Sequence, residues 1–137
     1  MPSSFMGYAV DWDLDGRRDI WTTRGDVFAS ASNYLASYGW ELAEPWGAEV
    51  SLPDGIGTAQ AGHESPRPLH AWLDEGVTFV GAPPAIAKDE PTTLVMPAGE
   101  GGPAYLVFSN YRVILRWNRS DYFAMSVVRL ADHIVYR

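Results

Sequence analysis

The most informative part of this sequence is Asp11-Trp12-Asp13-Leu14-Asp15-Gly16-Arg17-Arg18-Asp19. Acidic side chains stand at positions 1, 3, 5 and 9 of this stretch and glycine at position 6, which is the spacing that begins an EF-hand calcium loop. Ca²⁺ prefers six to eight oxygen ligands, and alternate carboxylates on a tight loop converge on one point. Gly16 permits the sharp turn, after which the backbone carbonyl of Arg17 points inward. We therefore predict a calcium site in this loop.

The end of the loop departs from the EF-hand pattern. Position 12 should be a bidentate glutamate, but Thr22 stands there and the nearest later acid is Asp26. We expect Asp26 to close a structural site, not a paired sensor, from the start of a helix. The predicted ligands are Asp11, Asp13, Asp15, Arg17, Asp19 and Asp26. The alternative is a solvated acidic turn, in which five acids within 16 residues would repel one another without a cation.

Composition and charge fit a soluble domain, or part of one, with a cation site. The 137 residues are 47% hydrophobic and contain no cysteine, which excludes disulfides and cysteine-ligated metals. No apolar run approaches the roughly 20 residues of a membrane span, and no signal peptide is visible. Residues 1–100 hold 15 of the 17 acids and 5 of the 10 bases. This acidic excess opposes a nucleic-acid partner.

Residue patterns predict helices around a loop-rich middle, and hence an α+β fold. A helix is expected near 27–38, with Asp26 as its N-cap and Gly39 just after its end. Residues 41–104 contain 9 of the 10 prolines and 9 of the 13 glycines, which indicates short elements. We expect a short helix over 69–75 and strands over 77–80, 92–96 and 104–108. A turn at 99–103 joins the last two strands into a hairpin.

Two helices are expected at the C-terminal end. Asn110 is predicted to cap the first, which breaks at Asn118, and Ser120 is predicted to cap the second. In the second helix, apolar residues recur at helical spacing: Phe123, Val127, Leu130 and Ile134.

No complete catalytic set appears among the residues. His63, His70 and His133 are scattered without metalloprotease spacing, and we expect one or two of them on the surface. Nucleophile-elbow, P-loop and dinucleotide-binding motifs are absent from the sequence. Composition and spacing alone therefore do not indicate an enzyme.

Two ordered blocks of sequence, about 70 residues apart, resemble the membrane-bound lytic murein transglycosylase B family. The first block comprises Met1-Pro2-Ser3-Ser4-Phe5, Tyr8-Ala9-Val10-Asp11, the acidic loop, Asp19-Ile20-Trp21 and Ser32-Asn33-Tyr34-Leu35 through Gly39-Trp40-Glu41. The second comprises Tyr105-Leu106-Val107, Asn110-Tyr111, Arg116-Trp117-Asn118-Arg119-Ser120, Tyr122-Phe123-Ala124-Met125 and Leu130-Ala131-Asp132-His133-Ile134. The resemblance covers nearly the whole chain and is weak over 43–91.

The resemblance implies non-hydrolytic cleavage of the bond between N-acetylmuramic acid and N-acetylglucosamine in peptidoglycan, giving 1,6-anhydro-muramoyl ends. One glutamate acts as acid and then as base. In the family this glutamate precedes the block that begins here at Met1, so no residue of this chain is assigned a catalytic role. We expect the chain alone to be an inactive, truncated portion, from a periplasmic or cell-envelope enzyme.

The resemblance also implies a lysozyme-like fold, represented here by part of the catalytic domain. Residues 1–40 would form the calcium loop and a core helix, 41–109 a small antiparallel β-rich insert, and 110–137 returning core helices. The residues carried over to the glycan cleft are Tyr34, Trp117, Asn118 and Phe123. Core packing is the alternative for Tyr34 and Phe123, and a helix-end turn is the alternative for Asn118.

Two other functions remain open from the sequence. One is a non-catalytic, calcium-stabilised glycan-binding module that uses exposed aromatic side chains. The other is an inactive fragment that exposes the apolar helix faces of 27–38 and 120–136.

Overall fold

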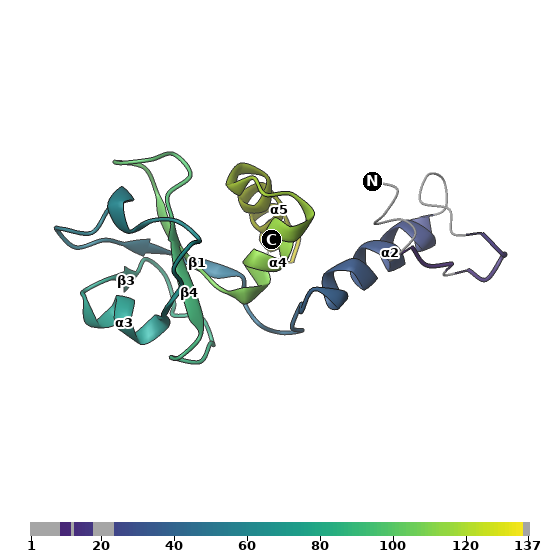
Figure 1. Ribbon diagram of the computed structural model, residues 1–137, viewed down its shortest axis with the longest axis horizontal. Helices are drawn as coiled ribbons and strands as arrows, with labels where there is room; N and C mark the ends of the chain where they lie inside the picture. Colours follow the sequence, from purple (N-terminus) through teal and green to yellow (C-terminus); the bar gives the residue numbers. More distant parts are fainter. Residues whose placement is uncertain (1–8, 12, 18–23, 136–137) are drawn as a thin grey trace. The chain divides into compact units, whose positions relative to one another are not determined.

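The computed structural model describes residues 9–11, 13–17 and 24–135, with the backbone alone at 26–28 and 135. The chain divides into two compact units, Met1–Glu41 and Leu42–Arg137. The first unit contains the acidic loop and helix α2 (Arg24–Ser37) (Figure 1).

Helix α2 ends as its sequence predicts. The Gly39 N–H donates to the Ala36 carbonyl and the Trp40 N–H to the Leu35 carbonyl, both at 3.1 Å, and Gly39 has a φ of +97°. These paired bonds satisfy carbonyls that the last helical turn leaves open, and glycine adopts the required left-handed backbone without a Cβ penalty. The predicted N-cap is wrong, because α2 already includes Arg24 and places Asp26 inside its first turn.

The second unit is built on a five-stranded antiparallel sheet in the order β2-β4-β5-β1-β3. Its strands are β1 (Gly47–Ser51), β2 (Arg67–Pro68), β3 (Thr78–Phe79), β4 (Pro91–Val95) and β5 (Ala104–Val107). The predicted strands over 77–80, 92–96 and 104–108 are confirmed within one or two residues. Strands β4 and β5 form the predicted hairpin, with Leu94 opposite Leu106.

Strand β1 lies between β5 and β3, and the sequence patterns missed it. Its sequence, Gly-Ala-Glu-Val-Ser, has weak β propensity. A Cβ on Gly47 would lie 2.4 Å from the Leu106 carbonyl oxygen. Glycine is therefore required here by the close approach of β5, a reason that only the paired strand reveals.

One face of the sheet packs on helix α3 (Leu69–Asp74), and the 3₁₀ turn η1 (Thr58–Gln60) lies in the loop after β1. The core on this face includes Val50, Leu69, Trp72, Leu94 and Leu106, all at most 4% exposed. The Trp72 indole donates to the Thr92 carbonyl at 3.1 Å, so its polar atom is satisfied inside the core. The predicted helix over 69–75 is thereby confirmed.

Helices α4 (Ser109–Trp117) and α5 (Asp121–Val135) lie on the other side of the sheet from α3 (Figure 1). Both helices are confirmed, as is Ser120 as a cap, because its Oγ accepts the Phe123 N–H at 3.3 Å. Tyr111 of α4 and Ala124 of α5 are fully buried. Strand β5 is consequently buried along its whole length.

The predicted cap of α4 is wrong. Asn110 lies inside the helix, 1% exposed, and its side chain donates to the Glu44 carbonyl at 2.9 Å. Glu90 performs the capping from 19 residues away: its Oε1 accepts the Ser109 N–H at 3.0 Å and the Ser109 hydroxyl at 2.6 Å. A carboxylate at this end also complements the helix dipole.

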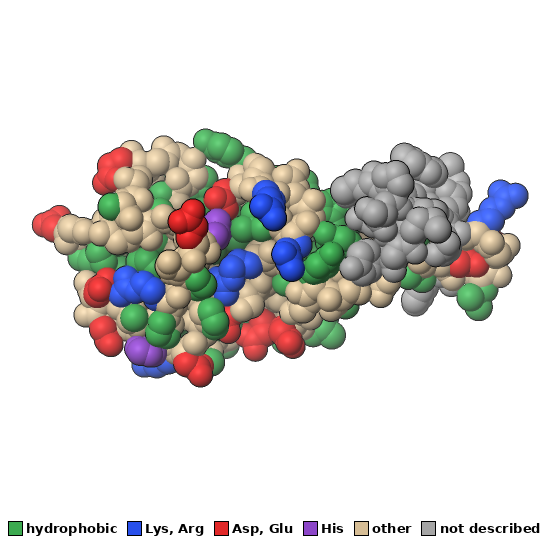
Figure 2. Space-filling model, viewed as in Figure 1, with side chains coloured by type: hydrophobic (Ala, Val, Ile, Leu, Met, Phe, Trp, Pro, Cys, Tyr) green, Lys and Arg blue, Asp and Glu red, His purple; other side chains and the backbone are tan. Residues whose placement is uncertain are grey.

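The apolar stripe predicted on the last helix is only partly used within the second unit. The buried residues of α5 include Ala124 and Val128, whereas Leu130 and Ile134 are 61% and 64% exposed. None of the helices in the described part of the chain is both long and apolar enough to cross a membrane. On the face drawn in Figure 2, basic side chains are interspersed with acidic ones, without a continuous basic stripe.

Candidate functional site

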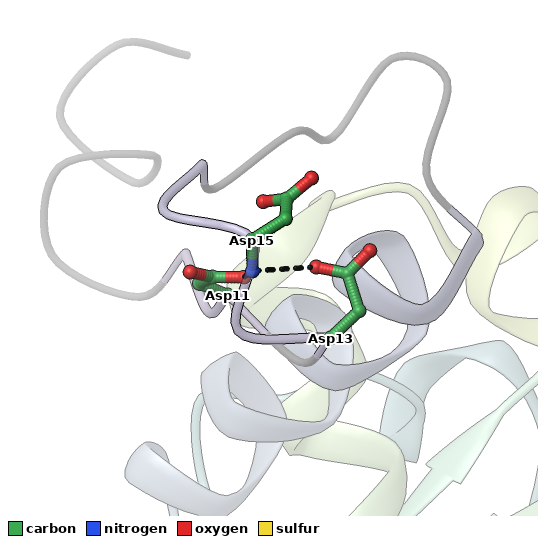
Figure 3. A group of neighbouring side chains, drawn as sticks. All are labelled: Asp11, Asp13 and Asp15. Carbon is green, nitrogen blue, oxygen red and sulfur yellow. Dashed lines mark hydrogen bonds between the residues drawn. The ribbon is translucent and has the colours of Figure 1, made fainter.

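The acidic loop folds so that its carboxylates accept hydrogen bonds from its own backbone. Asp11 accepts the N–H groups of Asp15 and Gly16, at 3.2 and 2.9 Å. Asp13 accepts the Asp15 N–H at 3.3 Å, and Asp15 accepts the Arg17 N–H at 2.8 Å. Figure 3 shows Asp11 and Asp13 on either side of the Asp15 amide. The carboxylates are thereby held on one turn.

Two left-handed residues make this turn possible. Gly16 has a φ of +89°, as its place in the motif predicts, and Leu14 has a φ of +60°. Leucine is disfavoured in that conformation by contact of its Cβ with the backbone. The loop is fastened to α2 because the Val10 N–H donates to the Ser30 hydroxyl at 2.7 Å.

One oxygen each from Asp11, Asp13 and Asp15 lies within 4.8 Å of the other two. This is the one group of three metal-ligating side chains found among the described residues. An all-oxygen, triply anionic donor set fits a hard cation such as Ca²⁺ better than a softer transition metal. Of the other predicted ligands, Asp19 and the Asp26 side chain lie outside the described residues, and no contact tests the Arg17 carbonyl.

Three of the predicted glycan-facing residues lie together around the junction of α4 and α5. Trp117 ends α4 with 38% of its surface exposed, and Asn118 is also exposed. The Asn118 Oδ1 accepts the Ser120 N–H at 3.1 Å, and Phe123 is half-buried in the first turn of α5. Residues 117–123 form the junction turn. These assignments stay predictions.

The fourth predicted residue, Tyr34, belongs to the first unit. Its side chain is 7% exposed, and its ring centroid lies 4.8 Å from that of Tyr38. The arrangement is compatible with the core-packing alternative, and its role in glycan binding stays a prediction.

A hydrogen-bonded network that the sequence patterns did not predict includes Asp121 of the junction turn. Asp121 Oδ1 accepts the Tyr111 hydroxyl at 2.7 Å and lies 2.9 Å from His63 Nε2. Since a carboxylate only accepts, Nε2 carries the proton of that bond. On the other side of the ring, His63 Nδ1 lies 3.3 Å from the Thr93 hydroxyl. The His63 and Tyr111 rings also stack, with centroids 6.0 Å apart.

The network changes the acidity of its members. Burial raises the pKa of Tyr111 far above its ordinary value, and the adjacent Asp121 carboxylate adds to this shift. Burial alone would raise the pKa of Asp121, but the hydrogen bonds from His63 and Tyr111 and the charge interaction with His63 lower it on balance. Asp121 therefore remains an ionised acceptor. No local sequence motif predicts these contacts, because His63 and Asp121 are 58 residues apart.

A hollow of ≈ 510 Å³ lies between β1, β5 and the second half of α5. Its polar groups bond one another: the Trp46 indole donates to Asp132 at 2.9 Å, and Arg129 donates to the Tyr105 hydroxyl at 3.4 Å. These bonds tie α5 to the sheet. Trp46, Asp132, Arg129 and Tyr105 therefore have structural partners in this hollow.

Comparison with known proteins matches these features to one family. Residues 1–132 match the family described as "Transglycosylase SLT domain". The membrane-bound lytic murein transglycosylase B of Escherichia coli is 27% identical over 139 residues, covering 98% of this chain and 36% of that protein. The chain thus spans little more than a third of this curated relative.

Solved structures give the same match. SltB3 from Pseudomonas aeruginosa, in complex with NAG-NAM-pentapeptide, is 42% identical with a TM-score of 0.93, covering 100% of this chain and 37% of that one. The soluble lytic transglycosylase SltB1 from the same organism is 31% identical with a TM-score of 0.83, covering 98% and 44%.

A third solved relative shares the fold. Slt35 of Escherichia coli, solved in complex with calcium, is 24% identical with a TM-score of 0.78, covering 98% of this chain and 42% of that one. The helices and antiparallel sheet described above are those of the lysozyme-like lytic transglycosylase fold. This chain therefore belongs to the Transglycosylase SLT domain family.

Proposed function

We propose that this chain acts as part of a lytic transglycosylase, which cleaves the N-acetylmuramic acid–N-acetylglucosamine bond of peptidoglycan and leaves a 1,6-anhydro end. The observation that carries the proposal is the family match over residues 1–132. It is supported by the likeness to SltB3, which was solved with a NAG-NAM-pentapeptide. Since the substrate is cell-wall polymer, the site of action is the cell envelope or periplasm.

The chain's own contribution is to hold the glycan. Trp117, at the end of α4, offers an exposed aromatic face of the kind that stacks on a sugar ring, and Asn118 beside it offers an amide for sugar hydroxyls. Phe123 in the same unit, and Tyr34 in the first unit, are the other residues proposed to contact glycan. Binding here would place the scissile bond against a catalytic group.

The catalytic group itself is not assigned to this chain. The reaction needs one carboxyl that protonates the leaving oxygen and then takes a proton from the sugar's own hydroxyl, so that the catalyst is regenerated without water. The family resemblance assigns this carboxyl to a glutamate that is not among these 137 residues. We therefore expect the chain alone to bind glycan without cleaving it.

A structural Ca²⁺ in the acidic loop is part of this proposal. Asp11, Asp13 and Asp15 would hold it directly, and the Arg17 carbonyl, Asp19 and Asp26 are the further proposed ligands. The convergence of three carboxylate oxygens supports the site, as does the solved calcium complex of the distant relative Slt35. When bound, the ion would neutralise the loop that the Val10–Ser30 hydrogen bond attaches to α2.

A non-catalytic glycan-binding module is the second candidate. The exposed apolar side chains Leu130 and Ile134 of α5 favour a partial catalytic domain instead. Within the second unit these two side chains are not covered, and the family match over residues 1–132 supports part of a catalytic domain over a separate binding module.

The purified chain and isolated peptidoglycan sacculi test the proposal. We expect saturable binding that Trp117→Ala weakens at least fivefold, with no release of anhydro-muropeptides. Trp40→Ala, which removes a tryptophan of the first unit outside the glycan-facing set, is the matched control and should bind like the unaltered chain. Absence of binding by a folded chain would contradict the glycan-facing role. Release of anhydro-muropeptides would contradict the assignment of the catalytic glutamate outside these residues.

A further inference from the structure

The carboxylate of Asp121 connects the junction turn to the β-rich segment. Asp121 lies inside the turn, between Asn118 and Phe123, and its Oδ1 is shared by His63 and Tyr111. Within the turn, the Ser120 N–H donates to Asn118 Oδ1 and the Phe123 N–H donates to the Ser120 hydroxyl. Asp121 thus joins the proposed glycan-binding residues to segments 10 and 58 residues away.

Contacts with strand β4 hold His63 in place. The Gly62 N–H donates to the Leu94 carbonyl at 2.9 Å, and Ala61 forms a β-bridge with Leu94. The fully buried Thr93 next in β4 places its hydroxyl 3.3 Å from His63 Nδ1. Both ring nitrogens therefore have partners, which fixes the orientation of the imidazole as well as its position.

Tyr111 donates the second hydrogen bond to the Asp121 carboxylate from a buried position in α4. Its ring is fully buried in α4, and its hydroxyl also lies 3.4 Å from the Asp121 backbone carbonyl. The ring stacks on His63 with an interplanar angle of 20°. Two donors from separate elements thus converge on one acceptor, and a charge-assisted hydrogen bond of this kind is stronger and shorter than a neutral one.

We propose that His63 and Tyr111 are positioning residues for glycan binding, because they fix the junction turn through Asp121. The β-rich segment would then orient the residues that contact the sugar without touching it. The proposal rests on the function given above, since it requires Trp117, Asn118 and Phe123 to face glycan. A misplaced turn lowers affinity because the binding groups must be ordered when the ligand arrives.

The test compares His63→Ala, His63→Gln and the control His70→Ala in the full chain. Glutamine can donate to Asp121 and accept from Thr93, whereas alanine does neither. His70 is an exposed histidine on α3, 3.8 Å from Asp74 and outside the network. The first readout is backbone order of Ser120 and Asp121 by ¹⁵N relaxation, and the second is the Kd for NAG-NAM-pentapeptide.

We expect His63→Ala to lower the order of the junction turn and to raise Kd at least fivefold. His63→Gln should restore both to within about twofold, and His70→Ala should change neither. Unchanged order in His63→Ala overturns the proposal whether or not glycan binds. Equal losses in the alanine and glutamine variants would also overturn it, because they would indicate general destabilisation.

Two further outcomes distinguish failure of the positioning role of His63 and Tyr111 from failure of the proposed glycan binding. If the unaltered chain is folded but binds no glycan, the proposed function fails, and the relaxation data still decide whether His63 orders the turn. If His63→Ala does not fold, Tyr111→Phe makes the same comparison, because it keeps the buried ring and removes one hydrogen bond. Normal turn order in Tyr111→Phe would then contradict the proposal.

Discussion

Asp13→Asn should change the stability of the acidic loop in opposite directions with and without calcium. Asparagine keeps an oxygen that can accept the Asp15 N–H, which Asp13 now does at 3.3 Å. The substitution removes one negative charge from a group whose oxygens lie within 4.8 Å of one another. The change therefore separates the effect of charge from that of loop geometry.

The size of the effect follows from Coulomb's law. Asp13 is exposed, so the dielectric constant of water applies, and each carboxylate pair costs roughly 1 kcal/mol at this distance. Physiological salt reduces this to about half. Loss of two repulsive pairs should then stabilise the calcium-free loop by about 1 kcal/mol. With calcium, the lost ligand charge should weaken binding by at least about tenfold, or roughly 1.4 kcal/mol.

Calorimetric titration with Ca²⁺ and thermal melting in calcium and in chelator measure both effects. At a hundredfold excess over its Kd, calcium should stabilise the unaltered first unit by about 2.7 kcal/mol. Asp54→Asn is the matched control, because Asp54 is an exposed acid in a loop of the other unit. The reasoning is refuted if Asp13→Asn destabilises the calcium-free chain, or if a folded unaltered chain shows no calcium response.

Three other substitutions or conditions give distinct outcomes. Leu14→Gly should stabilise the loop by roughly 0.5–1 kcal/mol, because glycine relieves the backbone strain of the left-handed conformation at φ +60°. Thermal melting measures this, and an unchanged melting temperature would contradict the strain at Leu14. Glu90→Gln should lower unfolding free energy by about 1 kcal/mol in urea titrations, because the anionic cap on Ser109 is lost; unchanged stability would refute the capping role. The lowered pKa of Asp121 means that its ionised form stabilises the fold above its unfolded pKa near 4. This stabilisation should disappear as pH falls through the lower pKa of the folded state. Tyr111→Phe removes a hydrogen bond that lowers the Asp121 pKa, so it should reduce the loss of folding stability at acid pH, measured by circular dichroism.

Local patterns in the sequence were sufficient for the elements that depend on local chemistry. The hairpin strands are runs of β-branched and aromatic residues bounded by proline or glycine, and Gly39 has the backbone freedom that a helix end requires. The same holds for Gly16 in the acidic loop. These residues act within a few positions of themselves, so a single sequence reveals them.

Features that depend on distant partners could not be predicted in this way. Gly47 is required by β5, and Glu90 displaces Asn110 as the cap of α4 from 19 residues away. The contact of His63 with Asp121 spans 58 residues, so no local pattern distinguishes His63 from an ordinary surface histidine. The predicted ligand Asp19 lies outside the described residues and stays a prediction.

A chimera tests the central claim most directly. Residues 1–137 would replace the 37% of SltB3 that this chain matches, and release of anhydro-muropeptides from sacculi would be measured beside unmodified SltB3. We predict that the chimera releases anhydro-muropeptides while the isolated chain does not, and that Trp117→Ala in the chimera lowers the rate at least tenfold. A folded chimera that releases none, beside an active SltB3 control, would contradict the claim that this chain supplies a working part of a lytic transglycosylase.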